Sequence, residues 1–382
     1  MCGIVGYVGY DEAAGKIIEG LKKLEYRGYD SSGIAILSDK GIELNKCKGE
    51  IKNLENMIAG RVPSGTCGIG HTRWATHGAP SDVNSHPHMD QSGRVALVHN
   101  GIVENYLELK EALINEHGIK FKSETDSEVI AQLVGVKYNA NGGDLEKAVY
   151  DAIKEMRGTY AIGVIAEDTP DKIVAYRKEA PLIAGLGKKS NFIASDIPAL
   201  LKYTNDIFLI ENDEMVICTP DSITIKDKDG KEVKREAMKI TWSVEDAEKG
   251  GYEHFMLKEI NEQPKVVAET LNRRIDEEGK IKLDGINLTK EELDKYNKIY
   301  IVACGTAYHA GLVGKYVIEK MAGIAVEVDV ASEFRYRDPF IDEKTLFIAI
   351  SQSGETLDTL MSLRLAKEKG ANPSFPNVLG SA

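Results

Sequence analysis

The spacing of hydrophobic residues changes along the chain and predicts two kinds of architecture. In the first part, residues 11–28 carry apolar side chains at helical intervals, so this segment is predicted to be an amphipathic helix. The apolar runs at 2–9 and 33–38, on either side of it, predict strands. A stretch that alternates around Asn100–Gly101 predicts a hairpin, because Asn-Gly favours a two-residue turn.

More helices and strands are predicted up to about residue 220. The helices are expected at 106–118 and 126–140, and the strands at 159–168, 172–178, 191–196 and 208–220. Elements that cluster without strict alternation of strand and helix are typical of a layered α+β domain. We therefore expect one α+β domain over residues 2–220.

A connector and a second, different domain are expected after it. Residues 221–289 are rich in charge and contain a predicted hairpin at 222–240 and a predicted helix at 254–275. Over residues 290–382, strand, turn and helix alternate, and the strands are almost continuously apolar, which predicts a parallel α/β sheet. This pattern ends after few strands, and the last eleven residues hold two prolines, so the second domain is expected to be truncated.

Charge and cysteine content narrow the class of protein further. The 382 residues exceed one ordinary domain, and their net charge of -12 without a long basic run makes nucleic acid an unexpected partner. Five cysteines without a C-x-x-C pair fit a reducing cytoplasm better than a disulfide framework or a zinc site. The sequence contains neither a signal-peptide pattern nor an apolar run of about 18 residues, so no membrane span is expected.

Cys2 is the first candidate for chemistry. Methionine is usually removed before a small residue, which would leave Cys2 with a free α-amine. The unperturbed pKa of an α-amine is about 7.7–8.0, so a nucleophilic thiol and a near-neutral base would share one residue. The alternative is a thiol that is simply buried in a strand.

Three other segments carry polar groups that an ordinary strand does not need. The stretch HTRWATHG (71–78) contains Arg73, whose planar guanidinium suits a carboxylate; the alternative is a solvated loop. Asn100 and Gly101 can form an oxyanion hole as well as a turn. Asp126 either receives a substrate ammonium group or is an acid in the first turn of a helix. The histidines of SHPH have no matching ligand cluster, so no metal site is expected.

Six ordered motifs resemble those of the class II glutamine amidotransferases, whose nucleophile is an N-terminal cysteine. They are MCGIVGYVG, LEYRGYDSSGIA, HTRWATHG, VNSHPH, HNGIVEN and SETDSEVIA. With KEINEQP, ACGTAYHAG, ASEFRYRDP and SQSGETLDT, the resemblance narrows to the glutamine–fructose-6-phosphate aminotransferases and extends to about residue 371. It implies an N-terminal-nucleophile (αββα) glutaminase domain, followed by a partial sugar-isomerase (SIS) domain with a parallel sheet.

The resemblance implies a role for each matching glutaminase residue. Cys2 would attack the side-chain amide of L-glutamine, with Asn100 and Gly101 as the oxyanion hole. Arg73 would bind the α-carboxylate of the substrate and Asp126 its α-ammonium group. The remaining implied residues are Thr76 and His77 in the glutamine pocket, Arg27 and His86 in the supporting loops, and Trp74 as the ammonia gate.

The second domain is implied to bind the phosphate of D-fructose 6-phosphate, without a cofactor. Hydroxyl groups and unpaired amides at two strand-to-helix turns would form the phosphate cradle, although either turn alone can be an ordinary βα loop. The implied sugar-phosphate residues are Thr306, Ser351, Gln352, Ser353 and Thr356. Ala307 stands where some family members have serine, so one phosphate donor is missing at this position.

The implied activity converts D-fructose 6-phosphate and L-glutamine to D-glucosamine 6-phosphate and L-glutamate, in a cytoplasmic homodimer. The family carries the lysine, carboxylate and histidine of its sugar chemistry in later segments, and none of these can be assigned here. We therefore expect this chain to keep the glutaminase half and part of the sugar-phosphate site. The alternatives are a stand-alone glutaminase, an amidotransferase for another phosphosugar, and a non-catalytic sugar-phosphate-binding protein.

Overall fold

Two units make up the chain, Met1–Gly250 and Gly251–Ala382, and each is described by itself. The structure is a computed structural model. It describes residues 2–75, 77–240, 250–272, 274–276, 278–281, 289–352, 354 and 356–371. Within these residues, every helix is too short or too polar to span a membrane.

Two antiparallel sheets form the centre of the first unit. One sheet has the strand order β14-β11-β9-β10-β1-β4-β2-β3 and the other has the order β13-β12-β8-β7-β6-β5. The strands of the first sheet are β1 (Gly3–Gly9), β2 (Ser31–Ser38), β3 (Gly41–Lys48), β4 (Cys67–Arg73), β9 (Ile183–Leu186), β10 (Ser190–Ala194), β11 (Asp206–Leu209) and β14 (Met238–Lys239). Those of the second are β5 (His88–Met89), β6 (Val95–Val103), β7 (Gly158–Ala166), β8 (Ile173–Lys178), β12 (Glu214–Cys218) and β13 (Ile223–Lys226).

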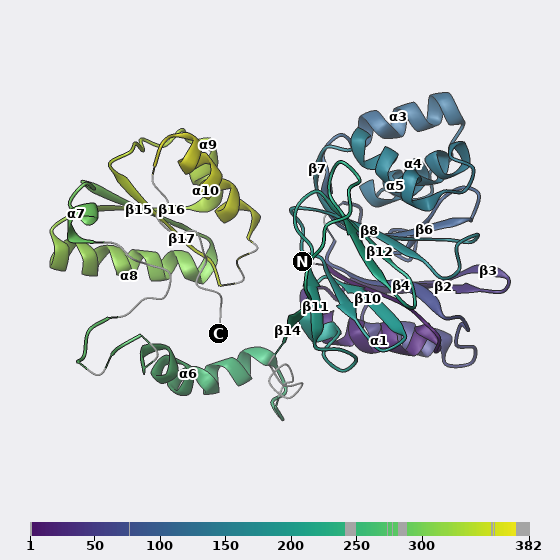
Figure 1. Cartoon of the computed structure of the whole chain (residues 1–382), viewed down its shortest axis with the longest axis horizontal. Coiled ribbons are helices and arrows are strands. Elements are labelled where there is room, and N and C mark those ends of the chain that lie inside the picture. The colour runs from purple at the N-terminus through teal and green to yellow at the C-terminus, as the bar shows by residue number, and fades with distance from the viewer. Residues whose placement is uncertain are drawn as a thin grey trace. The chain divides into compact units, whose positions relative to one another are not determined.

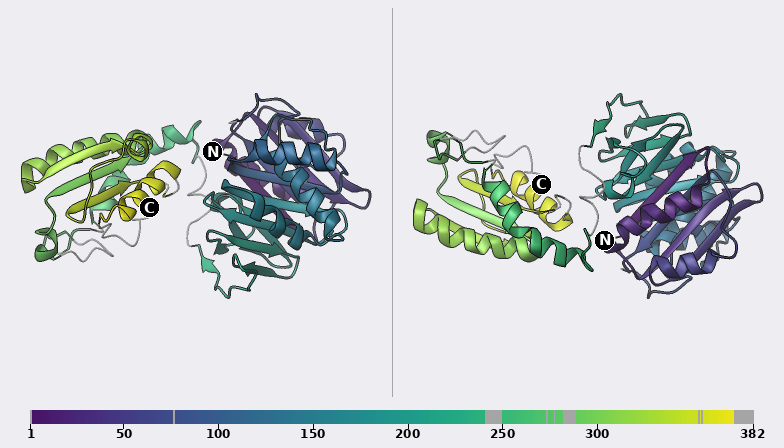
Figure 2. Two further views of the ribbon diagram at one scale, coloured as in Figure 1. Left: turned by 90° about the horizontal axis from the view of Figure 1, so that it is seen from above. Right: turned by 90° about the horizontal axis from the view of Figure 1, so that it is seen from below.

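Helices cover the outer face of each sheet, which gives four layers (Figure 1). Figure 2 shows one helical layer from above and α1, in purple, from below. The first sheet is covered by α1 (Ala13–Leu24) and α2 (Ile51–Ile58), and the second by α3 (Tyr106–His117), α4 (Asp126–Ala140) and α5 (Leu145–Glu155). The predicted αββα fold is therefore confirmed.

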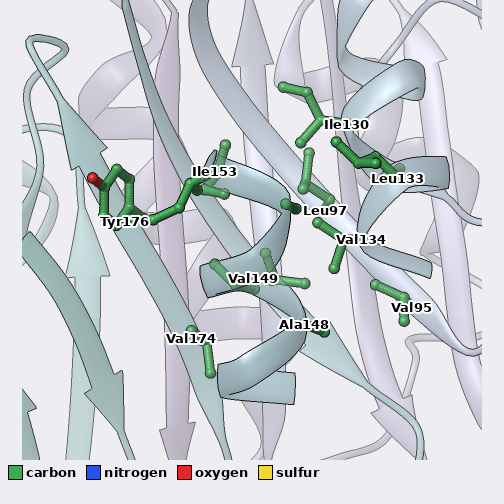
Figure 3. Packing of buried hydrophobic residues seen from close by; sticks show 14 of the residues in the cluster. Val95, Leu97, Ile130, Leu133, Val134, Ala148, Val149, Ile153, Val174 and Tyr176 are labelled. Atoms are coloured by element: carbon green, nitrogen blue, oxygen red, sulfur yellow. The ribbon is translucent and has the colours of Figure 1, made fainter. Parts of the chain in front are cut away.

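Three hydrophobic cores hold these layers together. Ile4 and Ile69 of the first sheet pack against Val98 of the second, which fills the space between the sheets. A further core lies between the first sheet and α1 with α2. Figure 3 shows the core on the other side, where side chains of α4 and α5 pack against Leu97 and Val174 of the second sheet. Burial of this apolar surface is the main driving force for the layered arrangement.

The hairpin predicted around Asn100–Gly101 is wrong. β6 continues unbroken through both residues, with Asn100 opposite Ala161 and Gly101 opposite Tyr160 in β7. Gly101 has a φ of 121°, and a Cβ atom there would lie 2.0 Å from the carbonyl oxygen of Thr159. The glycine is therefore required by a close approach inside a strand, and not by a turn.

Part of the predicted connector belongs to the sheets of the first unit. β13 lies at the edge of the second sheet, and a turn after it is closed by a bridge between Lys226 and Glu232. The chain does not complete the hairpin predicted at 222–240, because β14 pairs with β11 in the other sheet. The helix predicted at 254–275 is present as α6 (Phe255–Asn272).

The second unit contains a three-stranded parallel sheet, as predicted. Its strands β15 (Lys298–Ala303), β16 (Ala325–Val330) and β17 (Thr345–Ile350) have the order β16-β15-β17. The helices are α6, α7 (Lys290–Leu293), α8 (Gly305–Ala322), α9 (Ala331–Tyr336) and α10 (Leu357–Glu368). From β15 the chain continues to β16 on one side of it and then to β17 on the other side. The strand order therefore reverses beside β15, and such a switch point is the usual place for a ligand in a parallel sheet.

Candidate active site

Cys2 lies immediately before β1, a strand inside the first sheet with β10 and β4 as neighbours. The backbone N–H of Trp74 donates a hydrogen bond to Cys2 Sγ at 3.2 Å, and the carbonyl oxygen of Trp74 lies 3.5 Å from the same sulfur. Burial raises the pKa of the Cys2 thiol, and the Trp74 hydrogen bond opposes that rise. The thiol is therefore held at a defined position and requires a base to become a nucleophile at neutral pH.

Ser195 anchors the start of β1 by two hydrogen bonds to one residue. Its hydroxyl accepts a hydrogen bond from the backbone N–H of Ile4 at 3.0 Å, and its own N–H donates to the Ile4 carbonyl at 3.0 Å. Arg27, a predicted supporting residue, forms an ion pair with Asp196 at 3.1 Å and donates to the Ser195 carbonyl at 3.5 Å. Ser195 was not among the residues predicted from the sequence; a serine and an aspartate at the end of a predicted apolar strand were the signal for it.

Asn100 is the second residue that contacts Cys2, and it does so through its side chain. Its Nδ2 group donates to the backbone carbonyl of Cys2 at 3.1 Å, while its Oδ1 atom lies 2.9 Å from Nε2 of His71. The same Nε2 lies 3.0 Å from the carbonyl oxygen of His99. The predicted oxyanion-hole residues, Asn100 and Gly101, thus lie on β6 of the other sheet, opposite the strand end that carries the thiol.

Arg73, at the end of β4, has one half of its guanidinium engaged and the other half available. Its Nη2 group donates to the carbonyl oxygens of His77 and Gly78, the second at 3.1 Å. Its Nη1 atom is buried and has no hydrogen-bond partner among the described residues. Burial lowers the pKa of Arg73, and the nearby Cys2 and Asp126 act against this change. An anionic group bound at Nη1 would form an ion pair with this buried guanidinium.

Asp126 is buried at the first position of α4, where Thr125 caps the helix by accepting the Glu128 N–H at 3.2 Å. The Oδ2 atom of Asp126 accepts a hydrogen bond from the backbone N–H of Val103 at 3.0 Å. The electrostatic influence of Asp126 on Arg73 places both charges in one neighbourhood. A cationic group near the thiol, with an anionic group near that cation, suits a substrate that carries both a carboxylate and an ammonium group.

Trp74 lies on a loop that two neighbouring residues hold in place. Asp30 accepts a hydrogen bond from the N–H of Ala75 at 2.8 Å. Gly28 packs closely against the backbone of this loop, and a Cβ atom at Gly28 would be 2.6 Å from the Arg73 carbonyl carbon and 2.7 Å from the Trp74 nitrogen. The Trp74 ring is 47% exposed and meets the Tyr29 ring edge-on at 5.6 Å. The loop thus presents an aromatic surface while its backbone aligns the thiol.

Two other predicted pocket residues follow on the same loop. The His77 ring contacts the Tyr106 ring edge-on, with 5.6 Å between the ring centroids. Thr76 lies outside the described residues. The structure therefore brings together Cys2, Arg73, Asn100 and Asp126 with their supporting residues, and gives no position for Thr76.

Four buried histidines lie next to the site. The His86 ring stacks on the His71 ring at 4.0 Å and meets the His88 ring at 4.8 Å, while His99 Nδ1 lies 2.8 Å from the Ser127 hydroxyl. Burial lowers the pKa of all four, to about 3 for His71 and well below the usual value for His86 and His88. These rings are therefore neutral at physiological pH. No group of three or more potential ligands is arranged for a metal ion in the part of the chain that the structure describes.

The predicted sugar-phosphate residues gather at the ends of two neighbouring strands in the second unit. Ala303 of β15 lies opposite Ile350 of β17, so the loops that follow these strands are adjacent. In the β17 loop, the Ser351 hydroxyl accepts a hydrogen bond from the Gly354 N–H at 3.0 Å. Gln352 and Thr306 are exposed, Thr356 precedes α10, and Ser353 lies outside the described residues.

Comparison with known proteins matches both units. A glutamine amidotransferase domain matches residues 71–202 and a SIS domain matches residues 292–375. The glutamine–fructose-6-phosphate aminotransferase of Clostridium tetani is 58% identical over 100% of this chain and 62% of its own length. The corresponding protein of Thermus thermophilus is 51% identical over 97% of this chain and 60% of its own length. The chain thus spans less than two thirds of these relatives.

A solved structure shows the same fold. The glutamine phosphoribosylpyrophosphate amidotransferase from B. subtilis has a TM-score of 0.54 and 18% identity, and covers 97% of this chain and 80% of its own. At this identity the likeness concerns the fold alone. Together with the sequence identity to the relatives, the matching domains give the classification. The chain belongs, along its whole length, to the family of the glutamine–fructose-6-phosphate aminotransferases, of which it carries a glutamine amidotransferase domain followed by a SIS domain.

Proposed function

We propose that this chain provides the glutaminase half and part of the sugar-phosphate site of an enzyme that makes D-glucosamine 6-phosphate and L-glutamate from D-fructose 6-phosphate and L-glutamine. One observation supports this most directly: the Trp74 N–H and the Asn100 amide both bind Cys2, the buried Arg73 lies near its thiol, and the buried Asp126 lies near Arg73. The identity to relatives with this activity in their names agrees with it.

In the proposed reaction, the Cys2 thiolate attacks the side-chain amide carbon of glutamine. The α-amine that the removal of Met1 would expose takes the thiol proton through a water molecule. Asn100 Nδ2 and the Gly101 N–H donate to the oxyanion of the tetrahedral intermediate. The α-ammonium group of Cys2 then returns the proton to the amide nitrogen, the carbon–nitrogen bond breaks, and ammonia leaves a thioester on Cys2. Water hydrolyses the thioester to glutamate and restores the thiol.

Binding and ammonia transfer are assigned to the residues around the nucleophile. The free Nη1 of Arg73 binds the α-carboxylate of glutamine and Asp126 its α-ammonium group, while Thr76 and His77 line the pocket. The exposed ring of Trp74 gates the passage of ammonia, which has to stay unprotonated to react. Arg27 and His86 order the loops.

The sugar phosphate is proposed to bind at the turns after β15 and β17. Its phosphate is held by Thr306, Ser351, Gln352, Ser353 and Thr356, together with the amides at the start of α10. Ala307 offers no hydroxyl there. The chain is further proposed to act as a homodimer in the cytoplasm. Its five free cysteines suit that compartment, which is reducing.

Separate measurements of glutamate release and glucosamine 6-phosphate formation test the proposal. We expect the full chain to release glutamate and to form no amino sugar, and Cys2→Ala to abolish glutamate release. An electrophilic glutamine analogue should add once to the chain and not at all to Cys2→Ala, whereas Cys304→Ala, which removes another incompletely buried free thiol, should still react. Robust amino-sugar synthesis by these 382 residues, or an unreactive Cys2, would contradict the proposal.

A further inference from the structure

The side chain of Asn100 can face Cys2 with either end of its amide, and only one end can donate a hydrogen bond. We propose that His71 is a positioning residue that sets this orientation and so keeps the Asn100 NH₂ group directed at the reacting centre. The inference rests on the proposed function, because it concerns the oxyanion hole of that reaction. No resemblance and no motif had assigned a role to His71.

The two partners of His71 Nε2 determine which atom carries the proton. The nitrogen lies 3.0 Å from the His99 carbonyl oxygen and 2.9 Å from an atom of the Asn100 amide. A backbone carbonyl can only accept a hydrogen bond, so Nε2 must be protonated and must donate. A donor at 2.9 Å requires an acceptor, and the Asn100 atom that faces His71 is therefore the oxygen.

The orientation of the Asn100 oxygen also determines what the NH₂ end of the amide faces. With Oδ1 facing His71, Nδ2 faces Cys2 and donates to its carbonyl oxygen at 3.1 Å. A reversed amide would set an NH₂ group against the N–H of His71 and an oxygen against the Cys2 carbonyl. Both contacts would be repulsive, so the His71 proton and the Cys2 carbonyl together fix the direction of Asn100.

The surroundings of His71 keep its ring in this state. The residue is fully buried in β4, where Ile4 of β1 and Gly33 of β2 lie opposite it, and the His86 ring stacks on it at 4.0 Å. Its Nδ1 atom has no hydrogen-bond partner among the described residues. Because His71 belongs to the first sheet while His99 and Asn100 belong to the second, the two contacts of its Nε2 atom link the sheets at the site.

Loss of the His71 donor should lower turnover and spare substrate binding. Removal of an oxyanion-hole donor costs about 10²–10³ in kcat, so an Asn100 amide that is held at the Cys2 end alone should cost about 10–100-fold. The KM for glutamine should stay within about threefold, because Arg73 and Asp126 bind other groups of the substrate. His71→Leu tests the loss, and His71→Gln, whose amide can donate from a similar position, should recover most of the activity.

Three controls separate positioning from a structural effect. Ile69→Ala removes a buried side chain two residues earlier on the same face of β4, and should destabilise the unit without a comparable fall in kcat. In an Asn100→Ala background, His71→Leu should cause no further loss, because His71 acts through Asn100. An aldehyde analogue of glutamine, which forms a tetrahedral adduct with a thiol, should bind His71→Leu more weakly, whereas glutamate should bind it as well as before.

The outcomes distinguish this inference from the function on which it rests. If the unmodified chain releases no glutamate, the proposed function fails. If it does, and His71→Leu keeps kcat within threefold or His71→Gln is no better than His71→Leu, the inference fails alone. The tautomer of His71 in the unmodified chain, read from its ¹⁵N shifts, provides a test that needs no variant: a proton on Nδ1 and none on Nε2 overturns the inference.

Discussion

Acid should destabilise the first unit strongly, because three of its buried histidines have pKa values held far below that of an exposed histidine. The usual pKa of histidine is about 6.5, and burial lowers that of His71 to about 3 and those of His86 and His88 well below 6.5. The unfolded chain therefore binds protons that the folded unit excludes. Stability is complete above pH 6.5 and falls as the pH drops from 6.5 toward the pKa values of the folded state.

The size of the fall in the free energy of unfolding follows from these lowered histidine pKa values. Between pH 7.5 and pH 5.0, protonation of one histidine in the unfolded state alone lowers the free energy of unfolding by about 2 kcal/mol. His71, His86 and His88 together give about 6 kcal/mol, and His99, whose pKa burial also lowers, adds to this. A loss of that size is comparable with the whole stability of an ordinary domain, about 5–15 kcal/mol.

Urea unfolding at several pH values measures the effect on the full chain. Trp74 belongs to the first unit, so its fluorescence reports the unfolding of this unit. We expect the free energy of unfolding to fall by about 6 kcal/mol from pH 7.5 to pH 5.0. His86→Phe should reduce the fall by about 2 kcal/mol, because it removes one of the three groups. Substitution of the exposed His117 by glutamine should leave it unchanged. A total fall below about 2 kcal/mol, or an identical fall in His86→Phe, would refute the reasoning.

Three other substitutions test the site and its support. Arg73→Lys should raise the KM for glutamine about 10–100-fold in a glutamate-release assay, because lysine cannot hold the loop and the substrate carboxylate together; an unchanged KM would contradict the assigned role. Gly28→Ala should lower kcat at least about tenfold, since its Cβ would displace the Trp74 amide, while Gly15→Ala, which meets open space, should behave as the parent. Ser195→Ala should lower the free energy of unfolding in urea by about 1–3 kcal/mol, because a buried backbone amide loses its acceptor; no change would argue against that anchor.

Local signals were sufficient to predict much of the fold. The helix predicted at 126–140 has those bounds in the structure, because Thr125 caps it from the position just before the segment and the apolar residues follow a helical pattern within it. Asn100–Gly101 was misplaced in a turn because a positive φ at glycine serves a turn and a close strand contact equally. β3 and α2 were not predicted, since β3 is half-exposed along most of its length and α2 has only eight residues.

The residues of the candidate site also fall into two groups, those that the sequence could predict and those that it could not. The motifs pointed to Cys2, Arg73, Asn100 and Asp126, whose residue types state their chemistry. They could not reveal that His71 reaches Asn100 or that Ser195 binds Ile4, because these pairs lie 29 and 191 residues apart. Such contacts depend on how two sheets stack and on the register of their strands, which no short segment encodes.

The hydrogen bonds between Ile4 and Ser195 also determine how early the site can form during synthesis of the chain. The thiol is among the first groups that leave the ribosome, but Ser195, which fixes its strand, is synthesised 191 residues after Ile4. At about 5–20 residues per second, this interval lasts roughly 10–40 s. A nascent chain that ends before Ser195 therefore carries the thiol without this anchor, and the first residues can take part in the reaction only after β10 and Ser195 have been translated.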